Sequence, residues 1–410
     1  MSIFDKFKKQ NIEPRRNSRS GNVLALDIGT EWVKALVFFK ENGRVHTVGY
    51  GRSRQQAGAM KGGMITNIQN VKENCDLAIA EACKNLESKE YPESLYLGIA
   101  GEIVNGEVVY ANYEREMPEQ IITEEELHDI ESKLREETSD SIKVEIGKKH
   151  GISHAEIVEV SSTRKDCYIN GLRVSDLVGF KGKSVSFKIF FSFTQDQHIQ
   201  SIRTIAEYLG LSIAKITVVP FAIANNYSGS ERERFSGVFA DIGAGTTDVA
   251  MVSNGSFVGV KMFALGGRAF THRVQKLLNI DYLKAEKIKI RMSEDPKTDV
   301  IKLNDKQMIQ RAFEKDARVL VSGIQVSLSD MDEVETYPTR IFLSGGGAKL
   351  SQIQESIRTF AWLNYLPFEK FPEPELIYPR DLRNLVDEMN LLTDIDDVSV
   401  SAIALESLLN

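Results

Sequence analysis

Short apolar runs separated by glycine-containing turns dominate the first hundred residues. Runs of β-branched and apolar residues are typical of buried strands, and Asn42-Gly43 is typical of a hairpin turn. Residues 70–86 instead carry apolar side chains at helical spacing. This order of three strands, a helix and a fourth strand is typical of one half of a two-lobed α/β fold. The predicted strands are residues 23–28, 35–39, 44–50 and 95–100.

The middle of the chain changes character, with more charge and fewer glycines. Thr123 and Glu126 have the spacing of a capping box, which predicts a charged helix to about Lys149. We interpret residues 103–195 as an inserted α/β subdomain without chemistry of its own. The strands predicted within it are 155–162, 165–169 and 184–193, and a helix at 197–209 follows.

The strand-turn-strand pattern returns in the second half of the chain. Residues 235–259 predict paired strands, and a glycine pair at 266–267 precedes helical spacing. We therefore expect two related halves. The later predicted elements are helices at 266–292 and 305–328, an irregular acidic stretch at 372–397 and a final short helix at 398–409.

Composition limits the classes of function. The 410 residues have a formal net charge of −7, which argues against a general nucleic-acid binder. The three cysteines have no metal-binding spacing and are typical of a reducing cytoplasm. No apolar run approaches the roughly 18 residues of a membrane-spanning helix.

The N-terminal residues form a separate basic segment. Ile3, Phe4 and Phe7 share one helical face beside lysines, and 11–21 has the composition of a flexible linker. One interpretation is a short amphipathic anchor on anionic lipid, and the other is a frayed leader. Self-assembly would favour the anchor, because avidity multiplies weak contacts. The lysines that would contact lipid are Lys6, Lys8 and Lys9.

Three glycine-rich turns follow strand-like runs, and they carry the functional prediction. The turns lie at 27–30 (Asp-Ile-Gly-Thr), 241–248 (Asp-Ile-Gly-Ala-Gly-Thr-Thr-Asp) and 345–347 (three glycines). Such turns expose backbone N–H groups to phosphate, and threonine hydroxyls add donors. Asp27 and Asp241 each end a strand, where a carboxylate can hold the water shell of Mg²⁺. Two such turns facing each other predict a clamp on a nucleotide.

This set of turns resembles the actin/Hsp70/hexokinase-type ATPases over residues 22–410. The three turns match phosphate-1, phosphate-2 and adenosine motifs, and 220–224 and 402–405 resemble the two interdomain connecting segments. The resemblance implies a two-lobed actin-like α/β fold with duplicated sheet and helix halves that binds ATP and Mg²⁺, with Asp27 and Asp241 near the metal. The implied ATP contacts are Gly29, Thr30, Lys34, Gly243, Gly245, Thr246, Thr247, Gly266, Gly267, Glu286, Lys289, Gly345, Gly346 and Gly347.

Within that superfamily the chain resembles FtsA, the bacterial cell division protein. Residues 61–68 resemble its first lobe, 168–171 with 176–183 resemble its inserted 1C (SHS2-like) subdomain, and 266–271 resemble its GG-x-x-x-T motif. The resemblance implies a peripheral protein on the inner face of the cell membrane at the division site. Such a protein polymerises into filaments and tethers the tail of FtsZ.

Several positions depart from the FtsA pattern. Lys34 at the end of the first turn is more like PilM, the actin-like scaffold of type IV pilus assembly. FtsA usually anchors through a C-terminal amphipathic helix, whereas this chain ends at Asn410, so we expect any anchor to be N-terminal. Val218-Val219-Pro220 lacks the acidic residue of MreB-like filaments, and no residue is identified that would orient water. We therefore expect at most slow ATP hydrolysis.

Two other interpretations stay open: a PilM-like cytoplasmic scaffold, and a small-molecule kinase on the same fold. The kinase would require a carboxylate base beside a substrate pocket.

The predicted divisions of the chain are 1–21 for the basic N-terminal segment and linker, 22–102 for the first-lobe ATPase subdomain (1A), 103–195 for the inserted 1C-like subdomain, 196–232 for the remainder of the first lobe with the connecting helix, 233–395 for the second lobe (2A/2B) and 396–410 for the C-terminal helix that returns to the first lobe.

Overall fold

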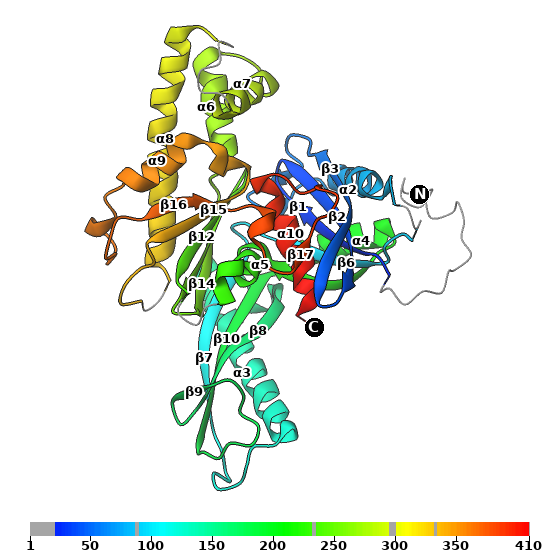
Figure 1. Ribbon diagram of the computed structural model, residues 1–410, viewed down its shortest axis with the longest axis vertical. Helices are drawn as coiled ribbons and strands as arrows, with labels where there is room; N and C mark the ends of the chain where they lie inside the picture. Colours follow the sequence, from blue (N-terminus) through cyan, green and yellow to red (C-terminus); the bar gives the residue numbers. More distant parts are fainter. Residues whose placement is uncertain (1–20, 87–89, 232–234, 295–300, 332–333, 410) are drawn as a thin grey trace.

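Two lobes lie side by side, and a third part projects below them in the computed structural model (Figure 1). The structure describes residues 21–86, 90–231, 235–294, 301–331 and 334–409. The proposed lipid-contacting residues Ile3, Phe4, Lys6, Phe7, Lys8 and Lys9 lie outside the described residues. Within the described parts, no helix is long and apolar enough to cross a bilayer.

The first lobe is built on a mixed sheet with the order β11-β6-β1-β2-β3-β17. Strand β1 pairs antiparallel with β2 and parallel with β6, and β2 pairs antiparallel with β3, which confirms the hairpin predicted at Asn42-Gly43. Helix α2 packs so closely on β3 that a Cβ on Gly51 would lie 2.2 Å from the carbonyl oxygen of Ala78. The elements are β1 Val23–Ile28, β2 Trp32–Glu41, β3 Arg44–Arg54, α2 Ile68–Cys83, β6 Ser94–Ile99, α4 Asp196–Leu209, β11 Ser212–Val218 and β17 Leu385–Val386.

The second lobe repeats this strand pattern. Strand β12 pairs antiparallel with β13 and parallel with β15, as β1 does with β2 and β6, so the two halves are duplicates in topology. Apolar side chains of the sheet and of its helices form a separate core. The elements are β12 Gly237–Ile242, β13 Thr247–Ser253, β14 Ser256–Phe263, α6 Gly267–Leu278, α7 Tyr282–Glu294, α8 Leu303–Ser329, β15 Arg340–Ser344, α9 Ser351–Thr359 and β16 Glu373–Leu376.

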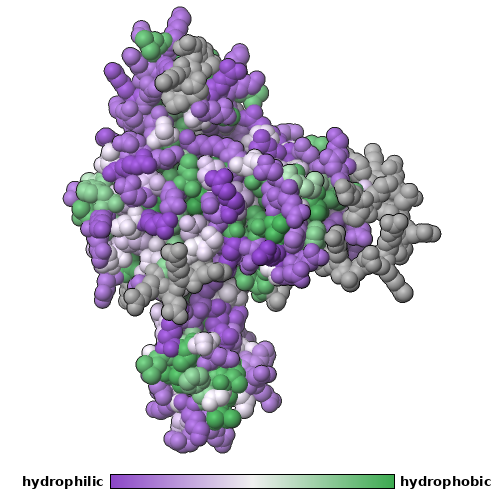
Figure 2. All heavy atoms as spheres, viewed as in Figure 1, coloured by the Kyte–Doolittle hydropathy of each residue, from purple (hydrophilic) through white to green (hydrophobic). Residues whose placement is uncertain are grey.

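The projecting part contains β7 Asn105–Glu114, α3 Glu124–His150, β8 Ile157–Ile169, β9 Leu172–Val174 and β10 Ser184–Gln195. Helix α3 begins as predicted, with the Thr123 hydroxyl accepting from the N–H of Glu126. The helix and strands enclose a core of their own. Strand β7 also joins the second-lobe sheet through the pair Val260–Gly106. Figure 2 shows hydrophobic residues gathered on this part of the surface.

Several predicted elements were wrong in extent. Residues 157–169 form the single strand β8 instead of two strands, with irregular register against β10, and residues 154–156 form a turn of 3-10 helix. The predicted helix at 266–292 is broken at Asn279, which ends α6 in the left-handed conformation (φ 50°). Strands β7 and β11 were missed, and the stretch predicted as irregular contains β16 and β17. These strands are short or mostly half-exposed, so their apolar pattern is weak.

The chain passes between the lobes at two helices that pack against each other, α5 Val219–Asn226 and α10 Val398–Leu405. Every residue of α10 is buried, which explains why its sequence is apolar apart from two serines, whose hydroxyls donate hydrogen bonds. Beyond α10, the buried Glu406 accepts hydrogen bonds from the side chains of Asn226 and Lys215. The second helix is therefore held against both the first helix and β11.

Candidate functional site

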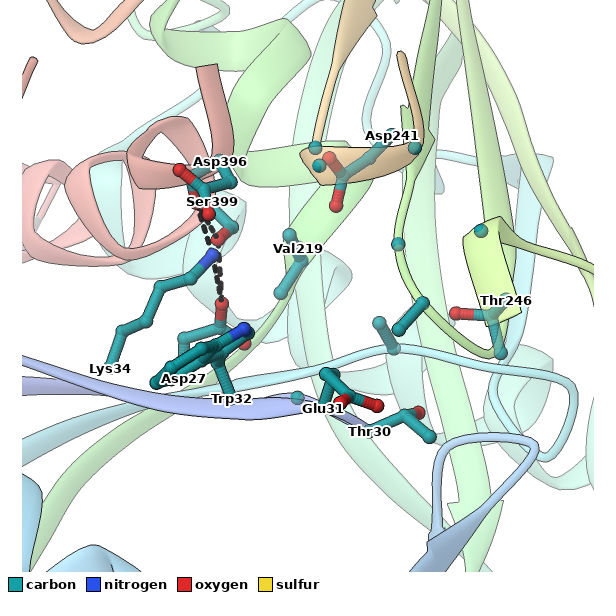
Figure 3. Close-up of a pocket in the computed structure, with 18 of the residues that line it drawn as sticks. Asp27, Thr30, Glu31, Trp32, Lys34, Val219, Asp241, Thr246, Asp396 and Ser399 are labelled. Atoms are coloured by element: carbon teal, nitrogen blue, oxygen red, sulfur yellow. Dashed lines mark hydrogen bonds and ion pairs between the residues drawn. The ribbon is translucent and has the colours of Figure 1, made fainter. Parts of the chain in front are cut away.

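A cavity of about 330 Å³ opens between the lobes, at the ends of β1, β12 and β15. All three predicted glycine turns contribute to its wall, together with the start of α6, one face of α7 and the segment before α10. This volume lies at the lower end of the range for small-molecule sites. Figure 3 shows the side chains of both phosphate-type turns directed toward this space.

The first turn begins at Asp27 and is closed by a backbone hydrogen bond of 3.0 Å from Gly29 to Trp32. A Cβ on Gly29 would lie 2.7 Å from the Trp32 carbonyl oxygen, so this tight turn requires glycine. The Asp27 carboxylate accepts a hydrogen bond of 2.6 Å from the hydroxyl of Ser399 in α10. The last helix therefore fixes the first turn.

Lys34 lines the cleft but is already engaged. Its ammonium donates to the backbone carbonyl of Asp396 and lies 3.7 Å from Asp27 (Figure 3). Burial alone would lower the pKa of Lys34, but the surrounding carboxylates, led by Asp27 and Asp396, hold that pKa above its usual value. The lysine therefore stays charged beneath the first turn.

The second turn is closed by a hydrogen bond from the N–H of Gly243 to the carbonyl of Thr246. A Cβ on Gly245 would lie 2.8 Å from the Thr30 hydroxyl oxygen, so the two turns nearly touch across the cleft. Thr246 lines the cleft, whereas Thr247 is fully buried and donates to the carbonyl of Leu265. Thr247 therefore stabilises the packing behind the turn and does not face the cleft.

Asp248 lines the cleft, although the sequence prediction assigned it no role. Asp248 is 2 % exposed, and its Oδ1 makes no hydrogen bond among the described residues. The nearby backbone amide of Gly101 offsets part of the effect of burial on the pKa of Asp248. Burial and the neighbouring Asp241 raise the pKa of Asp248 well above its usual range. Its position one residue beyond two threonines was the available signal.

The third turn shows why three successive glycines follow β15. Gly345 has φ 81°, and a Cβ there would lie 2.5 Å from the Ile242 carbonyl oxygen. A Cβ on Gly347 would lie 2.5 Å from the Ile242 side chain, while one on Gly346 would meet no atom of the described residues within 4 Å. The outer glycines therefore serve packing, and the middle one leaves open space in the cleft wall.

The start of α6 lies beside the third turn and is braced by α7. The N–H of Gly267 donates to Gly243, and Lys289 donates to the Gly267 carbonyl at 3.3 Å. Glu286 accepts from Lys289 at 2.9 Å and from the Thr271 hydroxyl. The predicted Glu and Lys of this helix thus face the cleft as a linked pair, where they could bind the polar groups of a ligand.

The donor set fits a cation that keeps most of its water. Asp241 is half-buried at the cleft wall, and burial raises its pKa even though the Ser344 hydroxyl donates to it at 2.8 Å. Asp248 adds an unpaired buried oxygen nearby. Within the described parts, no three His, Cys, Asp or Glu side chains converge as direct ligands. Few direct contacts suit Mg²⁺, which retains water and binds phosphate oxygens.

The cleft brings together most of the predicted site residues. Asp27, Gly29, Thr30, Lys34, Asp241, Gly243, Thr246, Gly267, Glu286, Lys289, Gly345, Gly346 and Gly347 line it, whereas Gly245, Thr247 and Gly266 do not. The sequence prediction missed other wall residues, some directly beside the predicted turns and some from distant segments. Those that bear polar groups include Glu31, His198, Asp248, Asp394, Asp396 and Ser399.

Comparisons with known proteins agree with this architecture. A family model described as "Cell division protein FtsA" matches residues 238–384. FtsA of Pseudomonas aeruginosa is 24% identical over 273 residues, which is 66% of this chain and 60% of that protein. FtsA of Escherichia coli K12 is 27% identical over 274 residues, again 66% of this chain and 60% of that protein. The matched region therefore spans about three fifths of these relatives.

Among solved structures, a chain of a PilM-PilN type IV pilus biogenesis complex superposes with a TM-score of 0.63. It is 16% identical and covers 94% of this chain and 98% of that chain, so the two share a fold. The duplicated lobes and the cleft between them define the actin-like ATPase fold, as predicted. Within that class the chain is FtsA-like in sequence, which confirms the predicted resemblance.

Proposed function

We propose that the cleft binds ATP together with Mg²⁺. The observation that carries the proposal is the convergence of three glycine turns, from both lobes, on one cavity. Exposed turn amides and the Thr246 hydroxyl suit phosphate oxygens. The open space at Gly346 suits the adenosine. Asp27 and Asp241 suit the water shell of the metal.

A pair of adjacent threonines tests this assignment. Thr246→Val removes a hydroxyl of the cleft wall, which donates to Asp248 at 3.3 Å, and Thr247→Val removes one that is bonded behind the wall. We expect titration with a fluorescent ATP analogue and Mg²⁺ to show roughly tenfold weaker binding for Thr246→Val and unchanged binding for Thr247→Val. Equal effects on binding would contradict the assigned geometry, and no binding by the unmodified protein would reject the nucleotide proposal.

We infer that hydrolysis is slow, because Asp248 is a poor base. Burial and Asp241 raise the pKa of Asp248, so a smaller fraction of this carboxyl is ionised and able to accept a proton from water than for an ordinary aspartate. ATP would then act mainly as a ligand that stabilises one arrangement of the lobes. Phosphate release during a single turnover measures the rate, and rapid turnover would contradict the inference.

We further propose an FtsA-like role: self-association into filaments that link the FtsZ tail to the cytoplasmic face of the membrane at the division site. Sequence similarity to FtsA over 66% of the chain supports it. A groove between α6 and α8 offers a surface for an acidic tail, because exposed Arg311 and Lys315 flank the apolar side chains of Leu277 and Met308. Such a mixture suits a peptide with both acidic and apolar residues.

The test of the partner uses two peptides in parallel, with ATP and Mg²⁺ present. One is the C-terminal tail of FtsZ from the same organism, and the other is the N-terminal cytoplasmic tail of its PilN. We expect saturable binding of the FtsZ tail alone, weakened by Arg311→Glu. Arg318→Glu on the exposed face of the same helix, outside the groove, is the matched control. Binding of the PilN tail alone would favour a PilM-like scaffold, which the shared fold also supports.

A further inference from the structure

One carboxylate joins the two lobes at the mouth of the nucleotide cleft. Glu31 follows the first turn, in the first lobe, and Arg268 lies in the first turn of α6, in the second lobe. The Arg268 guanidinium donates to Glu31 Oε2 at 2.7 Å and to the backbone carbonyl of Thr30 at 3.0 Å. A single side chain of the second lobe therefore holds both the side chain and the backbone of the first turn.

The two oxygens of Glu31 serve different lobes. Oε2 also accepts from the hydroxyl of Tyr282 in α7, at 3.2 Å, so this oxygen is held entirely by the second lobe. Oε1 accepts from the guanidinium of Arg54, in β3 of the first lobe, at 2.6 and 2.8 Å. Arg54 therefore offers a matched comparison: it binds the same carboxylate without crossing the cleft.

The group is buried and charged. Glu31 is 8 % exposed. Burial alone would raise the pKa of Glu31, but hydrogen bonds and the charges of Arg268 and Arg54 outweigh burial and lower that pKa. Burial alone would lower the pKa of Arg268, and Glu31 more than offsets this. Both partners stay ionised, and hydrogen bonds between ionised groups are the stronger kind.

We propose that Glu31, Arg268 and Tyr282 form an interlobe latch that keeps the cleft closed without help from a ligand and must break before a bound nucleotide can leave. Parting the lobes would separate Arg268 and Tyr282 from Glu31 and leave a half-buried charge on each side without its partner. The effect on ligand exchange rests on the proposed nucleotide function, whereas the effect on the lobes does not.

Exchange kinetics test the latch with nucleotide present. We expect Glu31→Gln and Arg268→Gln each to release a fluorescent ADP analogue roughly tenfold faster than the unmodified protein, by stopped flow with excess unlabelled ADP. The double variant should accelerate release by less than the product of the two single effects, because both changes break the contact between Arg268 and Glu31. Arg54→Gln should not accelerate release. Acceleration by Arg54→Gln as large as that by Arg268→Gln would show that the charge of Glu31 matters and the crossing contact does not, and would overturn the latch.

A second measurement needs no nucleotide. Spin labels at Leu77→Cys on α2 and Lys287→Cys on α7 report the distance between the lobes, since both positions are exposed and the native cysteines are buried. We expect a narrow distance distribution that widens or lengthens in Arg268→Gln and stays narrow in Arg54→Gln. An unchanged distribution in Arg268→Gln would overturn the latch even if nucleotide binds normally. A changed one would support the latch even if the cleft binds no nucleotide.

Discussion

The hydroxyl of Ser399, near the C-terminus, donates a hydrogen bond of 2.6 Å to Asp27, in the first strand. This hydrogen bond joins the last helix, α10, to the first turn, although the two residues lie 372 positions apart in the sequence. The Lys34 ammonium lies 3.7 Å from the same carboxylate and donates to the backbone carbonyl of Asp396. Side chains of β1, β2 and α10 therefore form this part of the cleft wall together.

Ser399→Ala should destabilise the protein by about 1.5–3 kcal/mol, the range for a hydrogen bond to a charged group. Urea unfolding measures this difference. Ser401→Ala is the control, because the Ser401 hydroxyl donates to the backbone carbonyl of Asp397 within the same segment. A smaller loss, under about 1.5 kcal/mol, is expected there, since that acceptor is neutral. Equal losses would contradict a special role for the contact with Asp27.

The glycines of the third turn should separate stability from binding. Gly346→Ala adds a methyl group to the open space of the cleft, so we expect a nearly unchanged melting temperature and weaker ATP binding. Gly345→Ala should lower the melting temperature, because alanine would adopt φ 81° against the Ile242 carbonyl. Thermal melting and nucleotide titration of both variants give the comparison. Normal ATP binding by Gly346→Ala would contradict the proposed position of the ligand.

Asp248 should make stability fall as pH rises. Its folded-state pKa lies well above the ordinary 3.8, mainly through burial, so the folded protein binds more protons than the unfolded chain above about that pH. Stability is therefore lost as pH rises from that value through the folded-state pKa. Asp248→Asn should equal the unmodified protein near pH 3.8 and exceed its stability progressively at higher pH, in urea unfolding without ligand. A stability difference that is constant with pH would contradict the raised pKa.

Lys165 should show the opposite trend. Its ammonium lies 4.1 Å from the centre of the Phe221 ring and donates to Asn225, and burial lowers its pKa to about 8 from 10.5. Between these values the unfolded chain binds more protons, so this group's contribution to stability rises with pH. Lys165→Met should stabilise the protein most below pH 8, and the advantage should shrink toward pH 10.5. Lys181→Met, at an exposed position, should show no such trend.

The sequence predicted the turns better than what surrounds them. Gly29 and Gly345 were identifiable because the local backbone requires glycine there: a Cβ on Gly29 would lie 2.7 Å from the Trp32 carbonyl oxygen, and Gly345 has φ 81°. Glu31 and Ser399 were missed because their partners lie more than 200 positions away, and no short pattern reports such pairing. Thr247 was assigned to the ligand because the two threonines look equivalent. The alternation of strand β13 turns the second one inward, to the carbonyl of Leu265.

The projecting part of the molecule is fastened at its base to both halves. Besides the backbone pair Val260–Gly106, Lys261 of the second lobe binds Glu107 at 3.2 Å, while Lys165 reaches Asn225 at the end of the connecting helix α5. Helix α3, with 27 residues, extends about 40 Å away from this base. A small rotation of this base would therefore move the far end through a longer arc. The position of the far end would therefore report a change at the base at a place well away from the cavity.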